Sequence, residues 1–373
     1  MSPFASIFVP DEIGAAVSDR AWLSAMLDAE RALARAEAKA GVITAEDAAA
    51  VEAACEGSYD VDGRPAGNPA EALARALRDR ASKAHYGATS QDIVDTAAML
   101  VAKRALVLVG GELAGAEDEC ATLAETHRRT VMPARTLLQQ ALPTTFGYKA
   151  AGWLVGLHET RTRLGALSLP AQLGGAAGTL AALGPTGAAV ATLYAEELGL
   201  REPIVPWHTI RTPVAELAGA LASAAGVAAK AAGDVVLLAQ TEVGEVAERD
   251  SGGSSTLPHK RNPINAILAV ACERHARANA GILFESIAQE HERAAGAWHA
   301  EWSALSNALA ATGGAAASLR RSLTGLEVDA DRMRANISPD VLAEAKRFGI
   351  DAAQPEDYLG SVDAFIDRAL ALR

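Results

Sequence analysis

The chain has few aromatic residues, few cysteines and no long uninterrupted hydrophobic run. Aromatic side chains make up 4% of its 373 residues, and its three cysteines lie far apart in the sequence, which leaves neither a disulfide framework nor a metal-ligand spacing. Glu216, Lys230 and Asp234 interrupt the most apolar stretch before it could span a bilayer, and the N-terminus lacks the pattern of a signal peptide. We therefore expect a cytoplasmic protein with no membrane association.

Positive charge is also scarce. Lys and Arg total 34 against 46 Asp and Glu, which gives a net charge of −12. Such a balance disfavours general binding to nucleic acids or to acidic membranes. If the ligand is an anion, the positive charge that binds it must be gathered locally.

Several cofactor motifs are missing. No two glycines stand two residues apart, so G-x-G-x-x-G cannot occur, and no Gly-Lys pair exists for a phosphate-binding loop. Neither H-E-x-x-H nor the E-x-x-H pair of di-iron bundles is present. We therefore expect no cofactor and no metal.

What is abundant is alanine and leucine at helical spacing. Ser18, Thr44 with Asp47, and Thr89 with Asp92 are typical helix starts, and Asn262 followed by Pro263 predicts another, with Asn262 as N-cap. The segment 57–69 is predicted to be a loop. The expected helices cover about 18–41, 44 onward, 70–82, 89–127, 144–168, 213–249 and 263–289. The fold class is therefore all-α, an antiparallel bundle of long helices followed by a small C-terminal lobe.

The stretch SGGSSTLPHKRNP at 251–263 is rich in groups that bind anions. Lys260 and Arg261 stand beside a helix start, where free N–H groups and the helix dipole favour a carboxylate or phosphate. The glycines allow close backbone approach, so consecutive N–H groups could stabilise an alkoxide of Ser254 or Ser255. The alternative is a flexible linker followed by an ordinary helix cap.

Two further stretches could carry chemistry. In HYGATSQD, 85–92, a capping box explains Thr89 and Asp92 but leaves His85 and Ser90 unexplained. In PARTLLQQALPTTFGYK, 133–149, polar residues precede a predicted helix start. The clusters PWHTIR, 206–211, and QEHERAAGAWHAEW, 289–302, concentrate His, Trp and Arg, although single histidines there are more often structural.

Taken in order, HYGATSQDIVDTA, ARTLLQQALPTTFG and GGSSTLPHKRNP resemble the motifs of the fumarase/aspartase superfamily, whose hallmark is a GSSxMPxKxNP loop. The resemblance covers roughly residues 1–335. GNP at 67–69, PWHTIR, TEVGEV at 241–246 and QEHERAAGAWHAEW look most like its 3-carboxy-cis,cis-muconate cycloisomerase branch, which serves protocatechuate breakdown in the β-ketoadipate pathway of aromatic degradation. The resemblance implies a three-lobed, all-helical subunit, a homotetramer with active sites shared between subunits, and no cofactor. We place the lobes at 1–88, 89–325 and 326–373, the last shorter than in most relatives.

The resemblance also implies roles for individual residues. Ser254 matches the loop serine that transfers the proton. The expected substrate-binding residues are His85, Thr89, Ser90, Thr136, Gln139, Gln140, His208, Arg211, Ser255, Lys260 and Asn262.

One departure from the superfamily pattern favours one branch. Many amine-eliminating members carry a general-acid histidine in the motif that matches ARTLLQQALPTTFG, whereas the candidate positions here are Leu137 and Gln140. An amine leaving group benefits from such an acid, but in the reverse of lactone formation the leaving group is a carboxylate, already a weak base. We therefore expect cycloisomerisation of a small tricarboxylate. A succinyl-amine lyase such as adenylosuccinate lyase, and a non-catalytic tetrameric relative, remain as alternatives.

Overall fold

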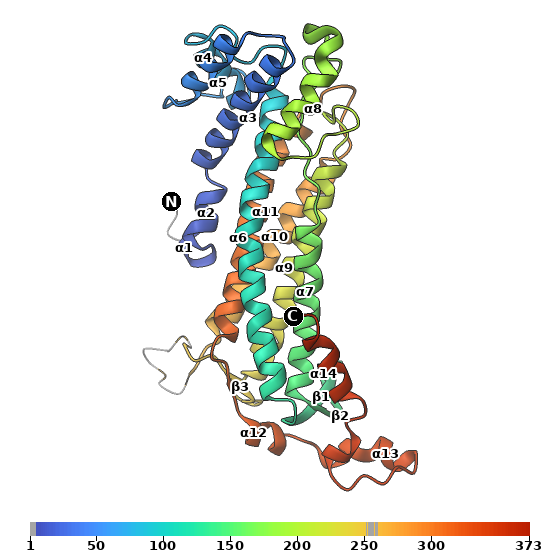
Figure 1. Ribbon diagram of the computed structural model, residues 1–373. Coiled ribbons are helices and arrows are strands. Elements are labelled where there is room, and N and C mark those ends of the chain that lie inside the picture. Colours follow the sequence, from blue (N-terminus) through green and yellow to red (C-terminus); the bar gives the residue numbers. More distant parts are fainter. Residues whose placement is uncertain (1–4, 251, 253–256, 258–259) are drawn as a thin grey trace.

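Five long helices form the body of the protein in the computed structural model, which describes residues 5–250, 252, 257 and 260–373. They are α6 (Ser90–Thr126), α7 (Phe146–Gly165), α9 (Thr212–Leu238), α10 (Ile264–Glu285) and α11 (Ala297–Leu323). They run side by side along one elongated axis (Figure 1). Helix α6 packs against α7 and α11, while α9 packs against α7, α10 and α11. The buried side chains are mainly alanine and leucine, which are not branched at Cβ and favour helices. The predicted all-α bundle is confirmed.

One end of the bundle holds the start of α6 together with α4 (Ala45–Cys55), α5 (Pro69–Arg78) and α8 (Gly187–Leu198), which follows η1 (Ala181–Thr186) (Figure 1). Helix α3 (Asp19–Lys39) leads to this end from α1 (Ala5–Phe8) and α2 (Asp11–Ala16), which lie about halfway along the bundle. Ser18 accepts a hydrogen bond from the backbone of Ala21, and Thr44 forms a capping box with Asp47, so both predicted helix starts are confirmed. We call this the α6 N-terminal end.

The opposite end holds two small sheets and the C-terminal segment (Figure 1). One sheet is the antiparallel hairpin of β1 (Val131–Thr136) and β2 (Gln139–Thr145), and the other pairs β3 (Val246–Ala247) with β4 (Glu327–Val328). The C-terminal elements are α12 (Ala330–Ala335), η2 (Pro339–Leu342), α13 (Ala343–Arg347), η3 (Pro355–Tyr358) and α14 (Val362–Leu370). We call this the hairpin end. The three-lobe division drawn from the sequence stays a prediction.

Two sequence predictions at the hairpin end are wrong. Helix α9 ends at Leu238 rather than near 249, because the following chain turns and pairs as β3 with β4. Asn262 does not cap α10, since its side-chain amide donates to the carbonyl oxygen of Gly252. The carboxylate of Glu248 caps the helix instead and accepts the backbone N–H groups of Asn265 (3.1 Å) and Ala266 (2.8 Å).

Helix α9 is, by length and composition alone, apolar enough to cross a membrane. Within the bundle it packs against α7, α10 and α11, and its buried face includes Leu217, Leu221 and Val235. A core helix of a soluble protein passes the same test, so these contacts are consistent with a soluble enzyme.

Candidate active site

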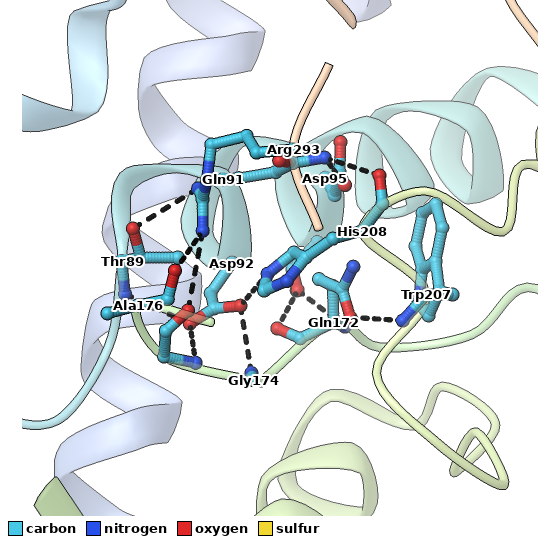
Figure 2. Close-up of polar contacts among 12 residues, drawn as sticks. Thr89, Gln91, Asp92, Asp95, Gln172, Gly174, Ala176, Trp207, His208 and Arg293 are labelled. Carbon is cyan, nitrogen blue, oxygen red and sulfur yellow. Dashed lines mark hydrogen bonds and ion pairs between the residues drawn. The ribbon is translucent and has the colours of Figure 1, made fainter. Parts of the chain in front are cut away.

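The start of α6 is organised around the buried carboxylate of Asp92. It accepts hydrogen bonds from the backbone N–H groups of Thr89, Gly174 and Gly175, each at 2.9 Å. His208 contacts the same carboxylate through Nε2 at 2.7 Å (Figure 2). Asp92 therefore fixes the first turn of α6, a glycine loop and a histidine relative to one another.

A second buried group lies one turn further along α6. Arg211 forms two-point contacts with the carboxylates of Asp95 (2.7 and 3.1 Å) and Glu301, and its guanidinium stacks 4.7 Å from the ring of Trp207. Only 2% of Arg211 is exposed, so two carboxylates neutralise its charge inside the protein. These contacts describe a buried structural brace, and the expectation that Arg211 binds substrate stays a prediction.

His85 lies just before α6 and is held by a buried acid. Its Nδ1 is 2.6 Å from Oε1 of Glu30, on α3, and its backbone φ of +59° lies in the left-handed region that non-glycine residues seldom occupy. Burial opposes a charged imidazole, but the charge and hydrogen bond of Glu30 outweigh it and raise the pKa of His85. A strained backbone at a histidine that a buried carboxylate holds, four residues before Thr89, is typical of a functional position.

The hairpin end contributes an exposed turn that the sequence did not predict. Thr136 pairs with Gln139 across a two-residue turn of Leu137 and Leu138, whose φ angles are +50° and +65°. Such turns normally carry Asn or Gly, and each left-handed leucine costs roughly 1–2 kcal/mol. Leu137 is 97% exposed and Leu138 70%. Exposed apolar groups of this kind are common at protein interfaces.

Gln140 ties this hairpin to the C-terminal segment. Its amide donates to the carbonyl oxygen of Asn336 (2.7 Å) and accepts the backbone N–H of Ser338 (2.9 Å). Nearby, Arg135 holds the buried carboxylate of Glu245 at two points, 3.0 and 2.5 Å, and Asn336 donates to that carboxylate as well. Both functional groups of Gln140 thus have partners within the chain, and its expected contact with substrate stays a prediction.

The loop before α10 is closed at its base by backbone pairing. Gly252 and Asn262 exchange two N–H to carbonyl hydrogen bonds of 3.0 Å. Arg261 forms an ion pair with Glu327 (2.9 Å), whereas among the described residues no carboxylate pairs with Lys260, which is exposed. Ser254 and Ser255 lie outside the described residues. Lys260 is therefore a cation beside the start of α10 that has no acidic partner among the described residues.

The expected site residues fall into two groups at opposite ends of the molecule. His85, Thr89, Ser90, His208 and Arg211 lie at the α6 N-terminal end. Thr136, Gln139, Gln140, Lys260 and Asn262 lie at the hairpin end (Figure 1). Helix α6 separates the groups with its 37 residues, which at 1.5 Å per residue span about 55 Å. No single pocket of one chain can hold both groups.

Some residues of these networks were missed in the sequence. Glu30 and Glu37 lie on the apolar face of α3 beside Leu33, and a carboxylate within an apolar stripe was a signal that could have marked them. Asp95 and Glu301 gave no comparable signal, because their partner Arg211 is distant in the sequence.

Comparison with known proteins agrees with this architecture. The family model described as "Lyase" matches residues 9–275. A 3-carboxy-cis,cis-muconate cycloisomerase of Bradyrhizobium diazoefficiens is 45% identical, over 96% of this chain and 84% of its own length. A nitrosuccinate lyase of Streptomyces davaonensis is 46% identical, over 87% of this chain and 74% of its own length.

Among solved structures, the 3-carboxy-cis,cis-muconate lactonizing enzyme of Pseudomonas putida superposes with a TM-score of 0.91 at 35% identity. The match covers 100% of this chain and 99% of that one. A fumarate lyase from Mesorhizobium superposes with a TM-score of 0.88 at 32% identity, over 98% of this chain and 99% of that one. The family match, the relatives and the fold agree: the chain belongs to the lyase family of the fumarase/aspartase superfamily.

Proposed function

We propose that this chain is a 3-carboxy-cis,cis-muconate cycloisomerase that works in the cytoplasm as a homotetramer. The observation that carries the proposal is the 45% identity, over 96% of the chain, to an enzyme of that name. The fold match to the Pseudomonas putida lactonizing enzyme along the whole chain supports it. The succinyl-amine lyase and non-catalytic alternatives gain no comparable support.

The chemistry follows from the substrate. One carboxylate oxygen adds to a carbon–carbon double bond of the same molecule and forms the lactone C–O bond, while a proton is delivered to the carbon beside another carboxylate. Ser254 is the proposed proton donor, and its alkoxide is the base in the reverse direction. The intermediate is an enolate-like carboxylate, whose developing charge Lys260 and loop N–H groups would stabilise.

The distribution of charge suits a substrate with three carboxylates. The chain carries a net charge of −12, yet Lys260, which pairs with no carboxylate among the described residues, lies beside the loop at the start of α10. Local gathering of this kind provides binding energy for a polyanion that the protein as a whole would repel.

Shared sites explain how both ends can act on one substrate. About 55 Å of helix separates Thr89 and Ser90 from the hairpin and the loop, so a complete site needs segments from different subunits. The exposed Leu137–Leu138 turn is a surface that such a neighbour would cover.

Light scattering should give the mass of a tetramer. Co-refolding of two inactive variants, Ser254→Ala and Thr89→Ala, should restore part of the activity, and no recovery would contradict shared sites.

The function is tested by mixing the purified protein with 3-carboxy-cis,cis-muconate and following loss of the conjugated-diene absorbance. Turnover that collapses in Ser254→Ala establishes both the reaction and its proton carrier. Turnover that survives in Ser254→Ala would show that another residue transfers the proton. No turnover by the native chain refutes the cycloisomerase proposal.

A second candidate substrate has one specific observation in its favour. The Streptomyces davaonensis nitrosuccinate lyase is as similar to this chain as the cycloisomerases are. Cleavage of the carbon–nitrogen bond of nitrosuccinate would release nitrite, a weak base that, like a carboxylate, leaves without a general acid. Assays for nitrite release should therefore run beside the diene assay, and the substrate with the larger kcat/KM identifies the reaction.

A further inference from the structure

Arg293 lies in the segment between α10 and α11 and reaches the start of α6. One terminal nitrogen of its guanidinium donates to the hydroxyl of Thr89 (3.3 Å), and the other donates to the carbonyl oxygens of Gly175 (3.4 Å) and Ala176 (2.9 Å). Figure 2 shows the guanidinium lying over Thr89 and the glycine loop that also binds Asp92. Arg293 is partly exposed, in contrast to the buried Arg211.

The contacts of Arg293 differ from those of the other arginines near the site. Arg135, Arg211 and Arg261 each bind a carboxylate of the chain, Glu245, Asp95 and Glu327 respectively. Among the described residues, Arg293 forms no ion pair with a carboxylate, and the oxygens to which it donates are all neutral. A guanidinium has five N–H donors, and the three contacts with neutral oxygens leave its Nε–H without a partner among the described residues.

Arg293 lies beside the first turn of α6 and adds positive charge there. Thr89 precedes the first turn of α6, where Ser90 is the first helical residue and the N–H groups carry partial positive charge. The one carboxylate inside this turn, Asp92, already accepts three backbone N–H groups and contacts His208. An external carboxylate placed beside Thr89 and Ser90 would therefore meet a cation that forms no ion pair with any acid of the described residues.

We propose that Arg293 binds one carboxylate of the substrate, together with Thr89 and Ser90, and so determines specificity for a polycarboxylate. This inference rests on the proposed function, in which three carboxylates must be bound. Lys260 from one subunit and Arg293 from another would each bind a different carboxylate and so hold the substrate across the shared site. Arginine suits this role because its planar fork matches both oxygens of a carboxylate.

A purely structural role for Arg293 predicts different behaviour. In that case its only work is to brace the carbonyl groups of Gly175 and Ala176, and glutamine, which also donates N–H groups, replaces much of that brace. Lysine would then have no advantage over glutamine. A carboxylate-binding role predicts the opposite order, because lysine keeps the positive charge and glutamine does not.

The test measures binding apart from turnover. In the Ser254→Ala background, calorimetry gives the Kd for 3-carboxy-cis,cis-muconate with Arg293, with Arg293→Lys and with Arg293→Gln. A charge-assisted hydrogen-bonded contact contributes about 1.5–3 kcal/mol, so Arg293→Gln should weaken binding by about 10- to 150-fold. Arg293→Lys should weaken it less. The matched control is Arg201→Gln, which removes an exposed arginine that donates to the carbonyl oxygen of Glu202 (3.3 Å), and its Kd should change less than about twofold.

The outcomes separate this proposal from the proposed function. If the Ser254→Ala parent does not bind the substrate and the native chain does not turn it over, the proposed function fails and the role of Arg293 falls with it. If the parent binds but Arg293→Gln binds equally well, only the role of Arg293 is refuted. If Arg293→Lys and Arg293→Gln lose the same affinity for the substrate and their melting temperatures fall alike, the role in substrate binding is refuted as well. That result would indicate that Arg293 only braces the glycine loop.

Discussion

Replacement of Arg211 by methionine distinguishes a structural arginine from a substrate ligand. Methionine keeps the unbranched length of the side chain but removes four hydrogen bonds to carboxylates, two each at Asp95 and Glu301. Asp95 would keep Gln91 and Trp298 as donors, and Glu301 would keep Gln289. Two neighbouring buried carboxylates would then lack a counter-charge. Loss of one partner from a buried ion pair costs about 3–5 kcal/mol, and we expect a destabilisation of that size.

The assay is equilibrium unfolding in urea at one fixed protomer concentration, because an oligomer's apparent stability depends on concentration. The control is Arg163→Met, which removes an exposed pair with Glu159 and should cost less than about 0.5 kcal/mol. Burial already raises the pKa of Glu301 although Arg211 opposes the shift, so without the arginine its protonated form gains further. The penalty should therefore shrink as the pH falls. If Arg211→Met loses no more free energy of unfolding than Arg163→Met but no longer binds substrate, the structural role is refuted and Arg211 is a substrate ligand.

Two further predictions concern Glu37 on α3 and Gln140 on β2. Burial, followed by repulsion from Glu30, raises the pKa of Glu37 to about 8. The folded state then binds a proton that the unfolded state releases, so stability should fall by up to about 1.4 kcal/mol per pH unit between the two pKa values. Glu37→Gln should remove that slope in pH-dependent unfolding, and an unchanged slope would assign it elsewhere. Gln140→Ala removes both contacts with Asn336 and Ser338, so limited proteolysis should cut the C-terminal segment faster, while an unchanged cleavage rate would show that other contacts hold it.

The helices were predictable because their causes are local. Ser18, Thr44 and Asp92 act within one turn of the helix starts they define, and the alanine and leucine spacing sets which faces are buried. The hairpin of β1 and β2 was not predictable in the same way. Its turn consists of two leucines, which carry no turn signal, and the strain of Leu137 and Leu138 is held by strand pairing.

The same distinction applies to the site. The order and kind of the chemical groups could be predicted from the sequence: the Thr89–Ser90 pair at a helix start, the serine-rich loop and Lys260. Which charges are already neutralised became known from the folded chain. Arg135 and Arg211 look like anion-binding residues in the sequence, yet each binds a carboxylate that lies more than 80 residues away. Arg293 is the reverse case, since only the folded chain shows that none of the described acidic residues pairs with it. Charge compensation depends on which residues meet in space, and one-dimensional spacing does not encode it.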